Sequence, residues 1–151
     1  SCIDSRVPVE TIFDQGIGDL FVARVAGNFE NVDILGSLEY SCKVAGSKLI
    51  MVLGHESCGA VKAACDGVEL GNITAMLSNI TPAVKVAALE EDGEINSSNA
   101  AFVARTVAEN VRLTIERIRA KSPILKEMEQ QGEIKFVGGV YGLASGSVTL
   151  L

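Results

Sequence analysis

A short, wholly apolar run near residue 50 constrains the fold of this chain more than any other feature. The run is Leu49–Leu53 (LIMVL), and Gly54 and His55 follow it directly. A continuous apolar stretch of this length, bounded by glycine, is typical of a strand in a parallel sheet, where both faces are buried. Ile134–Tyr141 (IKFVGGVY) predicts another core strand. The chain therefore needs helices to cover the sheet.

The remaining patterns predict how strands and helices alternate. Asp19–Val25 (DLFVARV) predicts a further strand, and residues 147–151 predict an edge strand at the C-terminus. Apolar residues at helical spacing predict helices over 32–45 and 98–120, with Gly46 suited to a left-handed cap after the first of these. We expect an α/β fold with a mainly parallel β-sheet flanked by helices.

Composition restricts the function classes. The 151 residues fit one domain, and their net charge of −6 without a Lys/Arg cluster makes nucleic acid an unsuitable partner. No apolar run approaches the roughly 20 residues that a membrane span needs. Hydrophobic residues nevertheless make up 48% of the chain. This surplus predicts a sizeable subunit interface.

Two cysteines and the only histidine form the set with the clearest chemistry. His55 follows a predicted strand, Cys58 lies three residues later at the start of the next helix, and Cys2 lies near the N-terminus. Two thiolates and one imidazole make a zinc set with one coordination position open, which is typical of catalytic rather than structural sites. Cys42 and Cys65 lie in apolar helical stretches and are interpreted as buried small side chains.

Each part of this set is weak evidence when taken alone. A His-x-x-Cys spacing arises by chance, and a histidine after a strand is often only hydrogen-bonded to backbone. Asp4 and Arg6 strengthen the hypothesis because they follow Cys2 by two and four residues. Elsewhere such a pair would be interpreted as a surface ion pair of little energetic value.

The same residues carry a family resemblance. Cys2–Arg6 (CIDSR) and Gly54–Val61 (GHESCGAV) resemble the signature pair of the β-class carbonic anhydrases. The similarity extends over essentially the whole chain. Further matching segments are Gly18–Phe21, Arg24–Asn28, Ser37–Tyr40 and Gly138–Tyr141.

The resemblance implies an activity and a role for each of the site residues. Cys2, His55 and Cys58 would bind one Zn²⁺ per chain, and Asp4 and Arg6 would form a catalytic dyad. The reaction would be reversible hydration of carbon dioxide to bicarbonate and a proton, by attack of zinc-bound hydroxide on CO2. The resemblance also implies a homodimer or a larger oligomer built from dimers.

Weaker expectations concern four more residues. Asp19, Arg24 and Gly59 match family positions near the substrate cleft, and Arg24 and Tyr141 resemble two residues of a regulatory bicarbonate site. A structural ion pair is an equally good interpretation of Asp19 and Arg24. A glycine that merely marks a loop between two elements is an equally good interpretation of Gly59.

The resemblance also sets an expectation about the ends of the chain. The family's N-terminal segment, including a strand that would lead into Cys2, is absent from residues 1–151, and the chain begins without methionine. We therefore expect a single zinc-binding carbonic anhydrase domain that is N-terminally incomplete. A cytoplasmic location is expected, with a periplasmic one as the alternative because a signal segment would precede Ser1.

Two alternative functions remain open at this point. The same fold and zinc site could act on another small substrate, as a carbon disulfide or carbonyl sulfide hydrolase. The chain could also be a non-catalytic zinc-binding assembly protein. Asp4 and Arg6 count against the second alternative, because metal binding alone needs neither residue.

Overall fold

The computed structural model describes residues 1–151, and its centre is a three-stranded sheet. β1 (Leu49–His55) pairs in parallel with β2 (Lys135–Tyr141), and β3 (Val148–Leu150) lies antiparallel on β2. The predicted α/β fold and C-terminal edge strand are confirmed, and the sheet is mixed, with its longer pairing parallel. β1 is two residues longer than the apolar run, so His55 is its last residue and lies opposite Tyr141.

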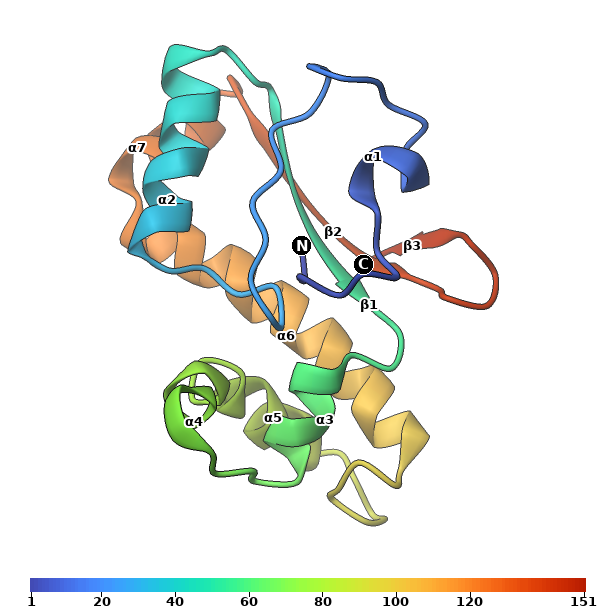
Figure 1. Ribbon diagram of the computed structural model, residues 1–151. Coiled ribbons are helices and arrows are strands. Elements are labelled where there is room, and N and C mark those ends of the chain that lie inside the picture. Colours follow the sequence, from blue (N-terminus) through green and yellow to red (C-terminus); the bar gives the residue numbers. More distant parts are fainter.

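The helices form two groups along the longest one (Figure 1). One group lies beside the sheet, and the other gathers at the far end of α6, where α3 and α5 contact it. None of the helices is both long and apolar enough to cross a membrane. The helices are α1 (Val9–Ile12), α2 (Val32–Glu39) with the following π-helical turn η1 (Tyr40–Val44), α3 (Gly59–Cys65), α4 (Gly71–Leu77), α5 (Thr81–Ala88), α6 (Ala100–Lys121) and α7 (Pro123–Gln130).

The helical predictions are confirmed to within a few residues. α6 begins two residues later than expected, because the Asn99 side chain accepts a hydrogen bond from Phe102 N and caps the helix. The predicted helix over 32–45 is α2 followed by η1, and Gly46 adopts the expected left-handed conformation, with φ of 84°. Cys42 and Cys65 are buried, as predicted.

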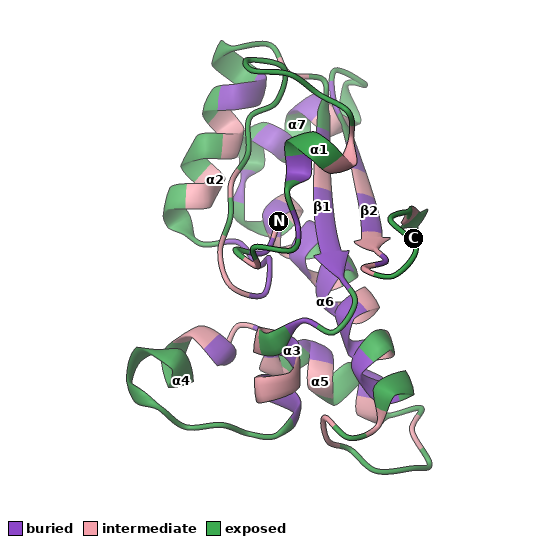
Figure 2. Ribbon diagram, turned by 45° about the vertical axis from the view of Figure 1, so that its right-hand side comes forward, coloured by how far each residue is buried: buried purple, intermediate pink, exposed green.

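α6 joins the two halves of the core. Its apolar stripe is buried along the whole length of the helix, which Figure 2 shows as purple patches facing both the sheet and the lower helices. The C-terminal half of the stripe packs in the cluster that contains residues of β1 and β2. The N-terminal half packs with α3 and α5. The stripe consists of Val103, Val107, Val111, Ile115 and Ile118.

Two strand glycines allow α6 to lie close to the sheet. A Cβ atom on Gly54 would come within 2.9 Å of a Val111 methyl carbon and 3.0 Å of one on Val107. A Cβ atom on Gly138 would come within 2.9 Å of Val111 and 3.3 Å of Ile115. Both approaches are closer than carbon atoms tolerate, so these positions require glycine for packing.

The predicted strand over Asp19–Val25 is wrong. This segment is extended, but its ladder-like hydrogen bonds are only those from Ser1 N to Ala23 O (2.9 Å) and from Val25 N to Ser1 O (3.1 Å). It lines a largely apolar cavity of about 550 Å³ together with β1. An extended segment becomes a strand only by pairing, and this one is not part of the sheet.

The loop that follows this segment is tied to α6. The carboxylate of Glu30 is 2% exposed and accepts hydrogen bonds from Arg117 Nε at 2.9 and 3.0 Å and from Lys121 Nζ at 2.8 Å. These ion pairs fix the end of the loop to the last turns of α6. Because α6 also packs on β1, the loop and the end of β1 are held in one frame.

Replacing Gly138 with alanine tests the close approach of α6. We expect Gly138→Ala to lower the free energy of unfolding by roughly 1–3 kcal/mol, because the new methyl group must displace Val111. Val111→Ala, which removes the methyl carbon that the new Cβ atom would meet, is tested alone and together with Gly138→Ala. Urea unfolding at fixed protein concentration measures each loss, and the double variant should lose less than the sum of the two single variants. Additive losses would contradict the packing argument.

Candidate metal centre

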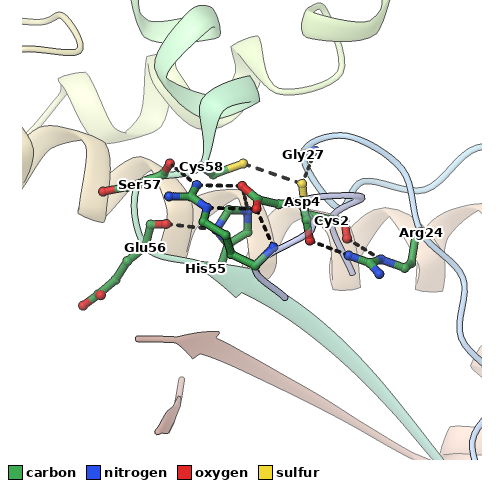
Figure 3. A network of polar contacts seen from close by, with 9 residues as sticks. Cys2, Asp4, Arg24, Gly27, His55, Glu56, Ser57 and Cys58 are labelled. Atoms are coloured by element: carbon green, nitrogen blue, oxygen red, sulfur yellow. Dashed lines mark hydrogen bonds and ion pairs between the residues drawn. The ribbon is translucent and has the colours of Figure 1, made fainter. Parts of the chain in front are cut away.

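Three separate parts of the chain bring Cys2, His55 and Cys58 together. His55 ends β1, Cys58 is the N-cap residue of α3, and Cys2 comes from the extended N-terminal segment. Their ligand atoms all lie within 4.8 Å of one another, and each side chain is at most 4% exposed. Figure 3 shows the three side chains converging beside the end of β1.

A tight turn returns Cys58 to the end of the strand. Ser57 has a φ of 52°, in the left-handed region that non-glycine residues seldom adopt. Its carbonyl oxygen accepts a weak hydrogen bond from Arg6 Nη2 at 3.4 Å. The turn is therefore held from the N-terminal segment as well as by its own helix.

The hydrogen bonds of His55 define which ring nitrogen is available. Its Nδ1 lies 2.9 Å from the carbonyl oxygen of Glu56, which can only accept, so Nδ1 carries the proton. Nε2 is then unprotonated and carries a free lone pair, and it is buried without any hydrogen-bond partner. Glu56 is itself fixed, because its N–H donates to Tyr141 O and its carboxylate accepts from Leu143 N, both at 2.9 Å.

The two thiols lie within hydrogen-bond distance of each other. Cys2 Sγ and Cys58 Sγ lie 3.9 Å apart, and Gly27 N–H donates to Cys2 Sγ at 3.3 Å. The hydrogen bond from Cys58 lowers the pKa of Cys2 far below that of an ordinary thiol. The same contact, together with burial, raises the pKa of Cys58. The contact therefore makes Cys2 the more acidic of the two thiols.

Asp4 and Arg6 form a two-pronged ion pair beside the cluster. Arg6 Nε donates to Asp4 Oδ1 at 2.9 Å, and Arg6 Nη2 donates to Asp4 Oδ2 at 2.7 Å. These bonds hold the pKa of Asp4 well below its usual range. Asp4 Oδ2 lies 3.8 Å from His55 Nε2, so a carboxylate faces the unpartnered nitrogen.

This donor set fits a zinc ion. A lone-pair nitrogen and two sulfurs lie close together in one buried space, and no hydrogen bond within the protein satisfies His55 Nε2. Buried polar atoms without partners are rare, so the arrangement favours a bound cation. Sulfur and imidazole nitrogen are the ligands that Zn²⁺ prefers.

The other predicted residues occupy different positions. Arg24 donates from Nε to Cys2 O and from Nη2 to Asp4 O, both at 2.6 Å, and so clamps the backbone of the ligand segment. Asp19 accepts a hydrogen bond from Gly16 N at 2.7 Å, and no hydrogen bond joins it to the three ligands. Gly59 is the first residue of α3, and Tyr141 is the last residue of β2, opposite His55. Their expected substrate or bicarbonate contacts stay predictions.

Three residues of the site were not identified from the sequence. Gly27 donates to Cys2 Sγ, Glu56 fixes the tautomer of His55, and Asn110 donates to the carbonyl oxygen of Gly27 at 2.7 Å. Gly27 lies within a segment that resembles the family, but a hydrogen bond from its backbone N–H cannot be inferred from the type of residue. Asn110 is a polar residue beside the apolar stripe of α6, which was a usable sign of a specific contact.

Comparison with known proteins agrees with the geometry. The family model described as carbonic anhydrase matches residues 1–148. The carbonic anhydrase of Mycolicibacterium smegmatis is 34% identical over 154 residues, which cover 99% of this chain and 71% of that protein. Carbonic anhydrase 2 of Mycobacterium tuberculosis is 36% identical over 154 residues, covering 99% of this chain and 70% of that protein.

Solved structures show the same fold. The β-carbonic anhydrase of Coccomyxa, in complex with acetazolamide, has a TM-score of 0.85 at 28% identity, covering 99% of this chain and 68% of that chain. A tetrameric β-carbonic anhydrase of Sordaria macrospora has a TM-score of 0.87 at 24% identity, covering 99% of this chain and 77% of that chain. The sequence match over nearly its whole length and the shared fold show that this chain belongs to the β-class carbonic anhydrases.

Proposed function

We propose that this chain catalyses the reversible hydration of carbon dioxide to bicarbonate and a proton, at one Zn²⁺ held by Cys2, His55 and Cys58. Membership of the carbonic anhydrase family supports the reaction. The observation that carries the site assignment is the buried cluster whose imidazole nitrogen has no partner. The family match favours carbon dioxide over carbon disulfide or carbonyl sulfide.

The three ligands would leave one coordination position for water or substrate. Zn²⁺, when bound there, lowers the pKa of water so that a nucleophile is available near neutral pH. The protein's contribution is a rigid, dry ligand set: Glu56 fixes the ring of His55, and Gly27 hydrogen-bonds to Cys2 Sγ. Each ligand is thereby aligned before the reaction begins.

Asp4 is the residue best placed to orient the nucleophile. Its low pKa keeps it ionised, so both carboxylate oxygens are acceptors only. An oxygen of Asp4 would accept a hydrogen bond from the hydroxide held in the open position and direct its lone pair toward the carbon of CO2. Arg6 engages both oxygens of Asp4, which holds that carboxylate in a fixed orientation. Asp4 and Arg6 thus act as a positioned pair.

Formal charge is balanced across the proposed centre. Two thiolates and the Asp4 carboxylate carry three negative charges, and Zn²⁺ with the Arg6 guanidinium carries three positive charges. A buried group of like charges is costly unless it is compensated. The balance explains why a carboxylate can lie 3.8 Å from a ligand nitrogen in this site.

We infer that the functional unit is a homodimer or an oligomer built from dimers. Large apolar side chains are exposed in one region: Val32 is 78% exposed, Phe21 65% and Tyr40 56%. The rings of Phe21 and Tyr40 contact each other edge to face, with centroids 6.4 Å apart, and all three residues line one surface hollow. Exposed apolar patches of this kind mark interfaces between proteins.

Replacing Asp4 with asparagine tests its orienting role. We expect Asp4→Asn to lower kcat for CO2 hydration roughly 100-fold, because misdirected reactants cost about that factor, while zinc stays bound at one per chain. Stopped-flow hydration assays and metal analysis measure the two quantities. Asp66→Asn is the matched control, since Asp66 also accepts a backbone hydrogen bond, from Ser97 N at 2.8 Å. A fall of equal size in both variants would contradict the role of Asp4.

Two cysteine variants test the metal ligands. We expect Cys58→Ser to lose zinc and hydration activity together, because a hydroxyl is a far weaker zinc ligand than a thiolate. Cys65→Ser should keep one zinc per chain, because Cys65 is also buried but donates to Thr106 Oγ1 and lies outside the ligand cluster. Elemental analysis after dialysis measures zinc in each variant. Retention of zinc by Cys58→Ser would rule out the proposed ligand set.

A charge placed in the exposed apolar region tests the oligomer. We expect the wild-type chain to sediment as a dimer or a multiple of it, and Phe21→Glu to shift the distribution toward monomer, because burying a carboxylate at an interface is unfavourable. Leu89→Glu is the control, since Leu89 is 84% exposed but lies at the end of α5. Wild-type sedimentation as a monomer at micromolar concentration would contradict the inference.

A further inference from the structure

A chain of two hydrogen bonds joins the centre of α6 to one of the metal ligands. Asn110 Nδ2 donates to the carbonyl oxygen of Gly27 at 2.7 Å, and Gly27 N–H donates to Cys2 Sγ at 3.3 Å. Asn110 is fully buried and lies 83 positions from Gly27 along the chain. Figure 3 shows Gly27 beside Cys2, with its contact directed at the sulfur.

The turn at Gly27 depends on outside support for its shape. Gly27 and Asn28 have φ values of 83° and 44°, so two consecutive residues adopt left-handed conformations. A Cβ atom on Gly27 would overlap Ile80 Cδ1, so a larger residue would have to displace Ile80 as well as adopt the left-handed conformation. The turn's own hydrogen bond runs from Asn28 N to Val25 O at 3.0 Å, and it does not involve the carbonyl of Gly27. Asn110 supplies the bond that this carbonyl receives.

Asn110 is poorly suited to a purely structural role. Its Oδ1 atom is buried without a hydrogen-bond partner, although its Nδ2 is well bonded. A half-satisfied buried amide destabilises a core relative to an apolar side chain of similar shape. Its neighbours in the same helical row, Thr106 and Thr114, both have hydrogen-bond partners for their hydroxyl groups. The one bond that Asn110 makes therefore accounts for its presence at this position.

We propose that Asn110 is a positioning residue for the metal centre. Its amide holds Gly27 so that the Gly27 N–H points at the Cys2 sulfur, and this bond fixes the sulfur and limits the charge that it donates to the metal. Hydrogen bonds to metal-bound sulfur act in this way in metal centres generally. The inference rests on the proposed zinc site, and it assigns a role to a residue that contacts neither metal nor substrate.

Asn110→Leu removes the donor and keeps the number and branching of the side-chain heavy atoms. We expect zinc affinity, measured by competition with a chelator, to fall about tenfold, as is usual when an outer hydrogen bond of a metal centre is lost. In the Co²⁺-substituted protein, the sulfur-to-cobalt charge-transfer band should move to longer wavelength, because a sulfur that has lost its hydrogen bond donates more readily. Thr106→Val is the matched control, a buried residue on the same face of α6 that does not contact Gly27. It should change neither quantity.

The outcomes separate this inference from the proposed function. If the wild-type chain binds neither zinc nor cobalt, the proposed metal centre fails, and the role of Asn110 falls with it. If the wild type binds both and Asn110→Leu leaves affinity and band unchanged, only the role of Asn110 is overturned. Should Asn110→Leu not fold, NMR of the wild type loaded with a spin-active cadmium isotope decides. We expect a scalar coupling between the metal and the Gly27 amide proton, and its absence would overturn the inference.

Discussion

The close contact between α6 and the two parallel strands is the constraint on which the rest of the structure depends. Gly54 and Gly138 leave room for Val111, so the helix lies directly against β1 and β2. From that position α6 holds the loop around Gly27 through Asn110 and through the ion pairs of Glu30. One helix therefore sets the distance between the end of β1, which carries His55, and the loop that hydrogen-bonds to Cys2.

The ligand cluster shows how a fold can prepare a site for a metal. Of the ring nitrogens of His55, one is bonded to a backbone carbonyl and the other is left without a partner. The two sulfurs lie close enough to share a proton, and Arg6 keeps Asp4 ionised beside them. The buried nitrogen without a partner is unfavourable in a protein interior unless a cation completes it. The family to which the chain belongs supports Zn²⁺ as that cation and hydration of carbon dioxide as the reaction.

The sequence was sufficient for the parts of the fold that have a local signal. The apolar run of β1, the periodic stripe of α6 and the capping position of Cys58 each follow from neighbouring residues. The segment over Asp19–Val25 was predicted as a strand because of its composition, but pairing is a property of the partner and not of the segment. The polar Asn110 beside the apolar stripe signalled a specific contact, but its partner was not predictable, because that partner is a backbone atom 83 positions away. The bond from Gly27 N to Cys2 Sγ likewise has no signal in residue type.

X-ray absorption spectroscopy of the zinc-loaded chain tests the central claim most directly. The account predicts a four-coordinate ion with two sulfur neighbours at about 2.3 Å and two nitrogen or oxygen neighbours at roughly 2.0–2.2 Å, the second of these from water or substrate. A first shell with fewer than two sulfurs would exclude Cys2 and Cys58 as joint ligands. A shell of four sulfurs would place the metal elsewhere and leave His55 without the partner that its buried nitrogen requires.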